Sequence, residues 1–135
     1  MSHETHPGLH RVMRATPDAV AVARHAVAAF ACDHGASARR ASDIALAVSE
    51  ACTNAVVHAY LDHDEPGTVE VDASRREGSL AVRVADHGRG LRPRPDSPGP
   101  GLGLPLIHVL SDECVLADGD PGTVVDLRFA IPQPV

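Results

Sequence analysis

Aromatic residues are scarce in this chain of 135 residues, which has no Trp and only Phe30, Tyr60 and Phe129 as aromatic side chains. Its core must therefore be built from Val, Leu, Ile and Ala, which the 44% hydrophobic share can supply. The formal net charge is −6. An acidic chain with so few aromatic residues does not suit nucleic-acid binding, which needs a basic face or stacking platforms.

The sequence also lacks a hydrophobic run near the roughly 18 residues that cross a bilayer. Residues 1–7 do not have the basic-then-apolar pattern of a secretory signal, so we expect a cytoplasmic protein. The three cysteines are odd in number and far apart, which argues against a disulfide framework or a zinc site. We expect Cys32, Cys52 and Cys114 to be buried thiols.

Two helices are predicted in the first half of the chain, after a short strand over residues 9–15. Thr16, Pro17 and Asp18 are typical of a helix start, and Gly35 can end that helix in a left-handed conformation. Ser37 is predicted to cap a second helix, which continues through residues 45–60 because no Gly or Pro interrupts it.

The second half of the chain changes to the two-residue period of strands. Alternation over residues 69–74 and 80–85 predicts an antiparallel hairpin. A proline-rich loop over residues 91–100 precedes a short helix that ends near Leu110. This helix is apolar nearly all round, so we expect it to be buried. Alternation over residues 123–131 predicts the last strand of a second hairpin.

The order of these segments predicts an α+β fold. It is a two-layer sandwich in which three main helices cover one face of an antiparallel-rich mixed sheet. We expect residues 1–8 to be a flexible tail and residues 9–135 to form a single domain.

Glu50 and Asn54 lie one turn apart on the second predicted helix, opposite the apolar stripe that contains Ile44, Val48 and Cys52. Leu46 flanks the polar pair, so the helix has apolar residues on both sides. This pattern indicates a second surface that faces a pocket. Most Glu and Asn residues on helices simply face solvent, so the pair alone does not define a site.

Two glycine-containing segments add to this pattern. Asp86, at the end of a predicted strand, is followed by Gly88 and Gly90, which would let the backbone approach a flat ring. A second cluster, over residues 99–104, places glycines before a helix start that can bind phosphate. Taken singly, the first segment is also typical of an ordinary turn and the second of a flexible loop.

The combination of motifs is more specific. In chain order, the motifs are Glu50-x-x-x-Asn54, Asp86-x-Gly88-x-Gly90, Gly99-x-Gly101-Leu102-Gly103-Leu104 and Gly122-Thr123. This set resembles the asparagine box and the glycine boxes of the histidine-kinase-like (GHKL) ATPase superfamily. The segment 49–60 is further similar to the bacterial anti-sigma-factor serine/threonine kinases. The resemblance spans roughly residues 9–131 and implies the histidine-kinase-like ATPase fold.

The resemblance implies ATP and Mg²⁺ as cofactors. Asn54 would hold Mg²⁺ through its amide oxygen, and Glu50 would take the proton from an attacking serine hydroxyl. Asp86, assisted by Thr123, would bind the adenine amino group. The glycines of the two boxes would line the adenine pocket (Gly88 and Gly90) and let the loop fold over the phosphates (Gly99, Gly101, Leu102, Gly103 and Leu104).

The partners that the resemblance implies are an anti-anti-sigma factor as the phosphorylated substrate and a sigma factor that the kinase sequesters. A homodimer is also implied. Two alternatives stay open from the residues alone: an ATP-binding module that holds a partner without transferring phosphate, and an ATPase in which Glu50 activates water. We expect no direct contact with nucleic acid or membrane.

Overall fold

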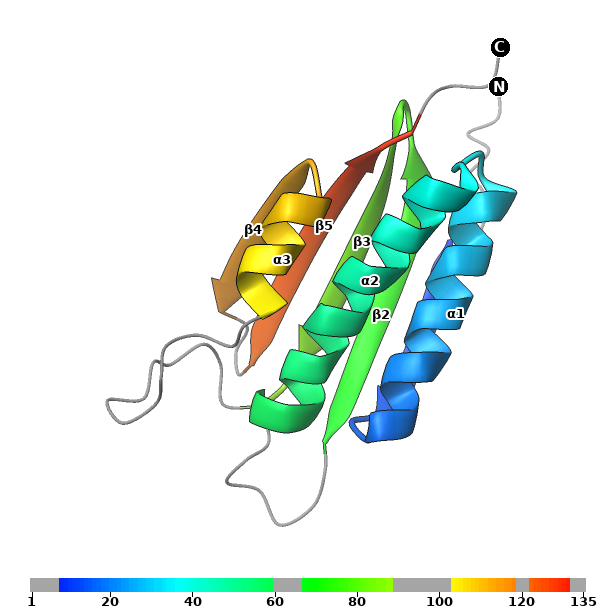
Figure 1. Ribbon diagram of the computed structural model, residues 1–135. Helices are drawn as coiled ribbons and strands as arrows, with labels where there is room; N and C mark the ends of the chain where they lie inside the picture. Colours follow the sequence, from blue (N-terminus) through cyan, green and yellow to red (C-terminus); the bar gives the residue numbers. More distant parts are fainter. Residues whose placement is uncertain (1–7, 60–66, 89–102, 119–121, 132–135) are drawn as a thin grey trace, which may run out of the picture.

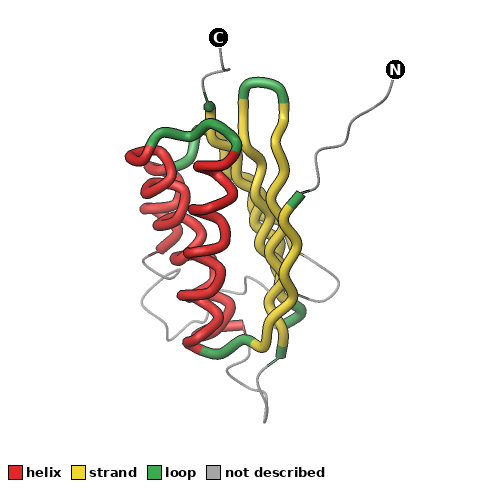
Figure 2. Tube along the Cα trace, turned by 90° about the vertical axis from the view of Figure 1, so that its right-hand side faces the viewer, coloured by secondary structure: helices red, strands yellow, loops and turns green. Residues whose placement is uncertain are grey.

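The computed structural model describes residues 8–59, 67–88, 103–118 and 122–131. A five-stranded sheet forms one layer, and the helices form the other (Figures 1 and 2). In spatial order the strands are β1 (Leu9–Arg14), β2 (Thr68–Arg76), β3 (Ser79–Asp86), β5 (Thr123–Ala130) and β4 (Glu113–Asp118). All four pairs among these described strands are antiparallel. The predicted fold class is confirmed, although the described strands form no parallel pair of the mixed sheet that we expect from the sequence.

The helical layer covers one face of the sheet and leaves the other open (Figure 2). Its helices are α1 (Pro17–Asp33), α2 (Ala38–Asn54), the short π-helix η1 (Ala55–Ala59) and α3 (Gly103–Leu110). Helix α2 packs between α1 and α3, which it contacts on either side. It is therefore the central element of the helical layer.

The predicted helix ends are confirmed where short polar residues and glycine determine them. The Ser37 hydroxyl accepts a hydrogen bond of 3.0 Å from the Arg40 N–H and so caps α2. Gly35, just after α1, has a φ of 101°, which is the left-handed conformation expected of a helix-ending glycine. Thr16 precedes α1 as predicted but makes no side-chain capping bond.

The core lies between the two layers and is aliphatic, as the composition predicts. The inward residues of β2 and β3 include Val69, Val71 and Leu80, all fully buried. They pack in one cluster with Ile44 of α2 and Phe129 of β5. The alternate residues of each strand face the open side of the sheet.

The prediction of one continuous α-helix through Tyr60 is wrong at its C-terminal end. The α-helix ends at Asn54, and the next five residues form η1. No Gly or Pro marks this change, so helix propensity could not reveal it. Single-turn π-helices are rare, and those that do occur lie frequently at functional sites.

Two burial predictions also need correction. Helix α3 was expected to be buried because it is apolar nearly all round, yet Val109 is 80% exposed and Ile107 alone is fully buried among residues 106–110. Of the three thiols expected to be buried, Cys52 is buried, Cys114 is half-buried and Cys32 is exposed near the end of α1.

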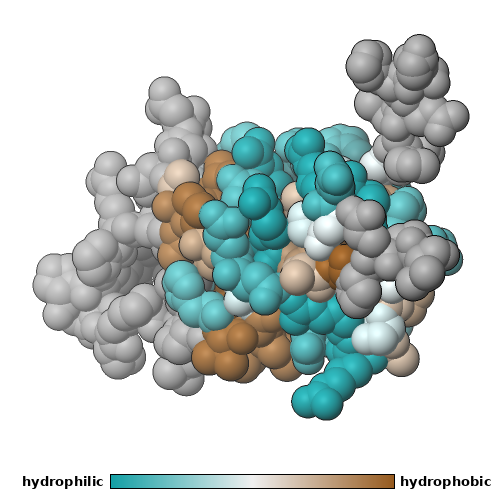
Figure 3. Space-filling view, turned by 90° about the horizontal axis from the view of Figure 1, so that it is seen from above, coloured by the Kyte–Doolittle hydropathy of each residue, from teal (hydrophilic) through white to brown (hydrophobic). Residues whose placement is uncertain are grey.

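Figure 3 shows the end of the molecule that lies at the top of Figure 1. Hydrophilic residues cover most of its described surface, and hydrophobic patches interrupt them. Within the described ranges, no helix has both the length and the apolar character needed to cross a membrane.

Candidate functional site

Four elements that carry predicted site residues have one terminus at the same end of the molecule, the lower end in Figure 1. The C-terminal end of α2, the end of β3 and the starts of α3 and β5 all lie there. In the β3–β5 register, Asp86 pairs directly with Thr123. The π-helix η1, which follows Asn54, contacts β3. The fold therefore gathers residues from distant parts of the sequence at one end.

Asp86 is the last residue of β3 and is only 8% exposed. Its Oδ1 accepts a hydrogen bond of 2.9 Å from the Gly88 N–H. Burial raises the pKa of Asp86, while backbone hydrogen bonds from Gly88 and Thr123 and the charge of His87 oppose this shift. A carboxylate has about four lone-pair sites, so these bonds leave room to accept a hydrogen bond from a ligand amine.

Gly122 lets the start of β5 lie against the end of β3. Its φ is +110°, and a Cβ at this position would lie 1.9 Å from the Asp86 carbonyl oxygen. The backbone beside the buried carboxylate therefore requires glycine here. Sequence reasoning noted the Gly122-Thr123 pair but gave Gly122 no role of its own, because the signal depends on a strand register that a single sequence does not reveal.

Glu50 and Asn54 lie one turn apart on α2, and both are half-buried. Their neighbours Ser49 and Cys52 are buried toward the core, so the polar pair faces another way. Leu46, at 42% exposed, and Val57, at 46% exposed, are apolar residues that the core does not take up. The helix thus has a buried face and a partly open polar face, as its pattern predicts.

The structure places the remaining predicted site residues less completely. Gly88 is buried beside Asp86, and Gly103 is the first residue of α3, which also contains Leu104. Gly90, Gly99, Gly101 and Leu102 lie outside the described residues. The adenine side of the predicted site is therefore described more fully than the phosphate loop.

The donors at this end suit a magnesium ion better than a zinc ion. Among the described residues, no three His, Cys, Asp or Glu side chains cluster as a metal site would require. Mg²⁺ commonly uses one or two protein oxygens and completes its octahedron with phosphate and water. The half-buried amide of Asn54, with the Glu50 carboxylate one turn away, fits that requirement.

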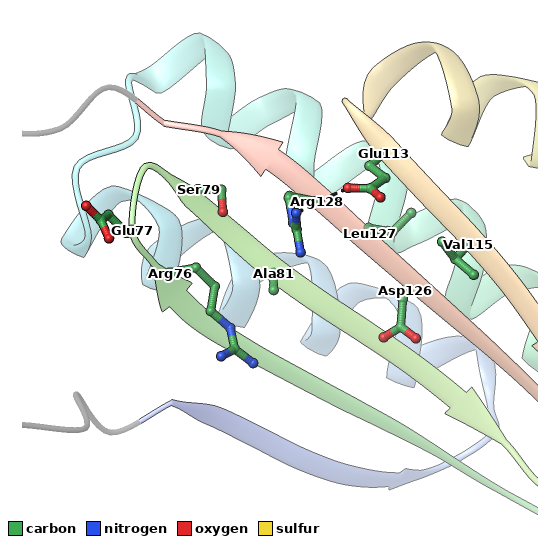
Figure 4. Close-up of a pocket in the computed structure, with 9 residues that line it drawn as sticks. All are labelled: Arg76, Glu77, Ser79, Ala81, Glu113, Val115, Asp126, Leu127 and Arg128. Carbon is green, nitrogen blue, oxygen red and sulfur yellow. Dashed lines mark ion pairs between the residues drawn. The ribbon is translucent and has the colours of Figure 1, made fainter. Parts of the chain in front are cut away.

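A shallow hollow of about 390 Å³ lies on the open face of the sheet, away from the site end (Figure 4). Its charges are largely paired within the protein. Arg128 lies 3.3 Å from Glu113, and Arg83 binds Asp126 at 2.8 Å. Because exposed ion pairs line it and no perturbed buried group points into it, this hollow does not resemble a ligand site.

The chain was compared with known families and curated proteins. The family model of the histidine kinase-like ATPase domain matches residues 13–129. The anti-sigma F factor of Clostridium botulinum is 28% identical over 120 residues, covering 80% of this chain and 83% of that protein. The serine-protein kinase RsbW of Bacillus licheniformis is 34% identical over 128 residues, covering 84% of this chain and 79% of that protein.

A solved structure agrees with these sequence matches. The RsbU and RsbW domains of Rv1364c from Mycobacterium tuberculosis superpose with a TM-score of 0.75 at 27% identity. The match covers 96% of this chain and 34% of that longer polypeptide. The chain belongs to the histidine kinase-like ATPase family, in its branch of anti-sigma-factor serine kinases.

Proposed function

We propose that this chain is an ATP-dependent serine protein kinase that acts as an anti-sigma factor. The observation that carries the proposal is its 34% identity to a serine-protein kinase RsbW across most of both chains. The pairing of Asp86 with Thr123 in the β3–β5 register also supports the proposal, because α2 ends at the same end of the molecule (Figure 1).

Asp86 would recognise the adenine of ATP by accepting a hydrogen bond from its exocyclic amino group. The two backbone N–H groups that bind this carboxylate fix its orientation before the nucleotide arrives. Thr123 is 8% exposed and sits directly across the strand pair, where its hydroxyl can support the same ring. Gly88, Gly90 and Gly122 would let the backbone approach the ring closely.

The phosphates would lie between α2 and the glycine loop that leads into α3. Asn54 would hold Mg²⁺ through its amide oxygen, and the bound ion would neutralise charge on the phosphates. Gly99, Gly101, Leu102, Gly103 and Leu104 would supply the loop backbone over the phosphates. The start of α3 would add the favourable N-terminal end of its dipole.

Glu50 would act as the general base. Its carboxylate would take the proton of the incoming serine hydroxyl as the serine oxygen forms a bond to the γ-phosphorus. The bond between that phosphorus and the ADP oxygen breaks in the same displacement. The base and the metal-holding amide must be neighbours for this step, and their spacing of one helical turn provides that.

The protein substrate would be an anti-anti-sigma factor, and the sequestered partner a sigma factor. Phosphorylation of the antagonist would release it, so that the kinase could hold the sigma factor again. The name anti-sigma F factor supports the sigma-factor partner, and the name serine-protein kinase supports a protein substrate. The choice of an anti-anti-sigma factor as that substrate rests on the family resemblance of the motifs.

The test is phosphoryl transfer from γ-labelled ATP to anti-anti-sigma proteins of the same organism. We expect the wild type to label a serine, and Glu50→Gln to lower the rate at least ~10²-fold, the usual scale for loss of a general base. Glu70→Gln, which changes a half-buried carboxylate on the opposite face of the sheet, is the matched control and should transfer normally. If the wild type binds ATP but neither labels a protein nor releases phosphate, the binding-module alternative replaces the kinase.

A further inference from the structure

A polar network joins α2, α3 and β5 at the end of the molecule opposite the candidate site. The Arg40 guanidinium donates to the Ala130 carbonyl at 3.1 Å and to the Leu110 carbonyl at 3.4 Å, and it forms an ion pair with Asp112. The Asp112 carboxylate also accepts a hydrogen bond of 2.7 Å from the Ala130 N–H. The guanidinium lies over the Phe129 ring, 5.4 Å from its centre. We call this network the Arg40–Asp112 clamp.

The clamp matters most for α3, because apolar burial holds this helix only in part. Within residues 106–110, Ile107 is fully buried, Leu106 and Leu110 are half-buried, and Val109 is 80% exposed. The helix has only eight residues. The bond from Arg40 to the Leu110 carbonyl therefore adds a directional contact at its last residue.

The three elements that meet at the clamp carry predicted site residues at their other ends. Asn54 ends α2, Thr123 begins β5 and Gly103 begins α3. Along α2, Arg40 and Asn54 are about 20 Å apart at 1.5 Å per residue. A clamp at one end of the molecule would thus limit how far α3 can shift along α2 and β5. It would thereby limit the movement of the start of α3 at the opposite end.

We propose that Arg40 and Asp112 are positioning residues for the nucleotide site, acting by holding α3 in register with α2 and β5. The inference rests on the proposed function, because it assigns the start of α3 to the phosphates of ATP. Without the clamp, α3 would keep its buried Ile107 contact but could shift along α2. The start of α3 would then lose its fixed position relative to the ends of α2 and β5, while most of the core would be unchanged.

Arg75 provides a matched control within the same chain. Its guanidinium donates to the His34 carbonyl at 2.9 Å and so ties β2 to the end of α1. Like Arg40, it is an arginine that binds a backbone carbonyl at the end of a helix. This hydrogen bond involves neither α3 nor β5.

The experiment measures the Kd of a fluorescent ATP analogue with Mg²⁺, together with the free energy of unfolding in urea, for the wild type and for Arg40→Ala, Asp112→Asn and Arg75→Ala. We expect Arg40→Ala to raise the Kd about tenfold and Asp112→Asn to raise it by less. Arg75→Ala should leave the Kd of the folded protein unchanged even where it lowers stability as much. Asp112→Asn leaves both Arg40–carbonyl bonds possible, so it tests the clamp if Arg40→Ala does not fold.

A Kd unchanged in both clamp variants would overturn the inference while leaving the proposed function intact. An equal rise in Arg75→Ala would also overturn it, because the effect would then be one of general stability. If the wild type bound no nucleotide, the proposed function and the inference would both fail.

Discussion

Asp86 combines burial with a charge, and this has opposite consequences for stability and for binding. Burial raises the pKa of its carboxyl above 3.8, so the folded state disfavours the ionised form. The resulting penalty is complete above the raised pKa and disappears as the pH falls below the ordinary value. A group kept at such a cost is typical of a functional site.

The first prediction concerns Asp86→Asn. At pH 7 we expect the free energy of unfolding of the variant to be equal to or higher than that of the wild type. This difference should become smaller as the pH falls toward 4. Its affinity for ATP should fall about tenfold, as expected for loss of a charge-assisted hydrogen bond, and it should discriminate less between ATP and GTP.

Urea unfolding at several pH values and nucleotide titrations check this prediction. Asp126→Asn, which removes an exposed carboxylate paired with Arg83, is the control and should not change nucleotide binding. A variant that is less stable at pH 7 and retains the wild-type preference for ATP would contradict the assignment of Asp86.

Gly122→Ala tests the close approach of β5 to β3. A Cβ there would overlap the Asp86 carbonyl, whereas a Cβ on Gly35, at a similar φ, would meet no atom closer than 3.9 Å. We therefore expect a loss in unfolding free energy of about 3 kcal/mol or more for Gly122→Ala, against about 1 kcal/mol for Gly35→Ala. Equal losses in urea unfolding would show that the strand ends are not in close contact.

At the scale of elements, the two long helices begin in the same way in sequence but not in structure. Ser37 makes a capping bond to α2, whereas Thr16 makes no such bond to α1. Both residues are typical caps, and only the structure distinguishes them. We expect Ser37→Ala to lower the free energy of unfolding by about 1 kcal/mol and Thr16→Ala by clearly less. A larger loss for Thr16→Ala in thermal or urea unfolding would contradict this reading of the caps.

The elements themselves were largely predictable because each has a periodic pattern. Alternation located β2, β3 and β5, and the short polar residue Ser37 and the glycine Gly35 located helix ends. The switch to η1 after Asn54 could not be predicted, because no residue there breaks a helix. The exposure of Val109 also escaped prediction, since a helix with apolar residues on every side has no pattern that identifies its outer face.

At the scale of the molecule, the sequence provides candidates for the site residues but does not show how they meet. The motifs and the family resemblance that they carry indicate Glu50, Asn54, Asp86 and Thr123 as candidates. Their arrangement depends on the β3–β5 register and on the order in which the five strands pair. These are long-range pairings that local patterns do not encode, and the same is true of the Arg40–Asp112 clamp.

The two ends of the molecule differ in their polar contacts. One end gathers the buried carboxylate, the glycine-dependent strand contact and the polar face of α2. At the other end, the Arg40 guanidinium of α2 donates to one carbonyl of β5 and to one of α3. Because helices and strands are stiff, we infer that the contacts at the second end influence the geometry of the first.

We expect a magnesium-bound purine triphosphate to occupy the side of the molecule where α2 and β3 end and where α3 and β5 begin. A titration of the isotopically labelled chain with Mg²⁺ and ATP, followed by amide chemical shifts, tests it most directly. We expect the largest changes at Asn54, Asp86, Gly88 and Thr123, and none at Ser79 or Ala81 beside the hollow on the open face of the sheet. Changes confined to that hollow, or no saturable change at the four site residues, would contradict the assignment of the nucleotide to this end.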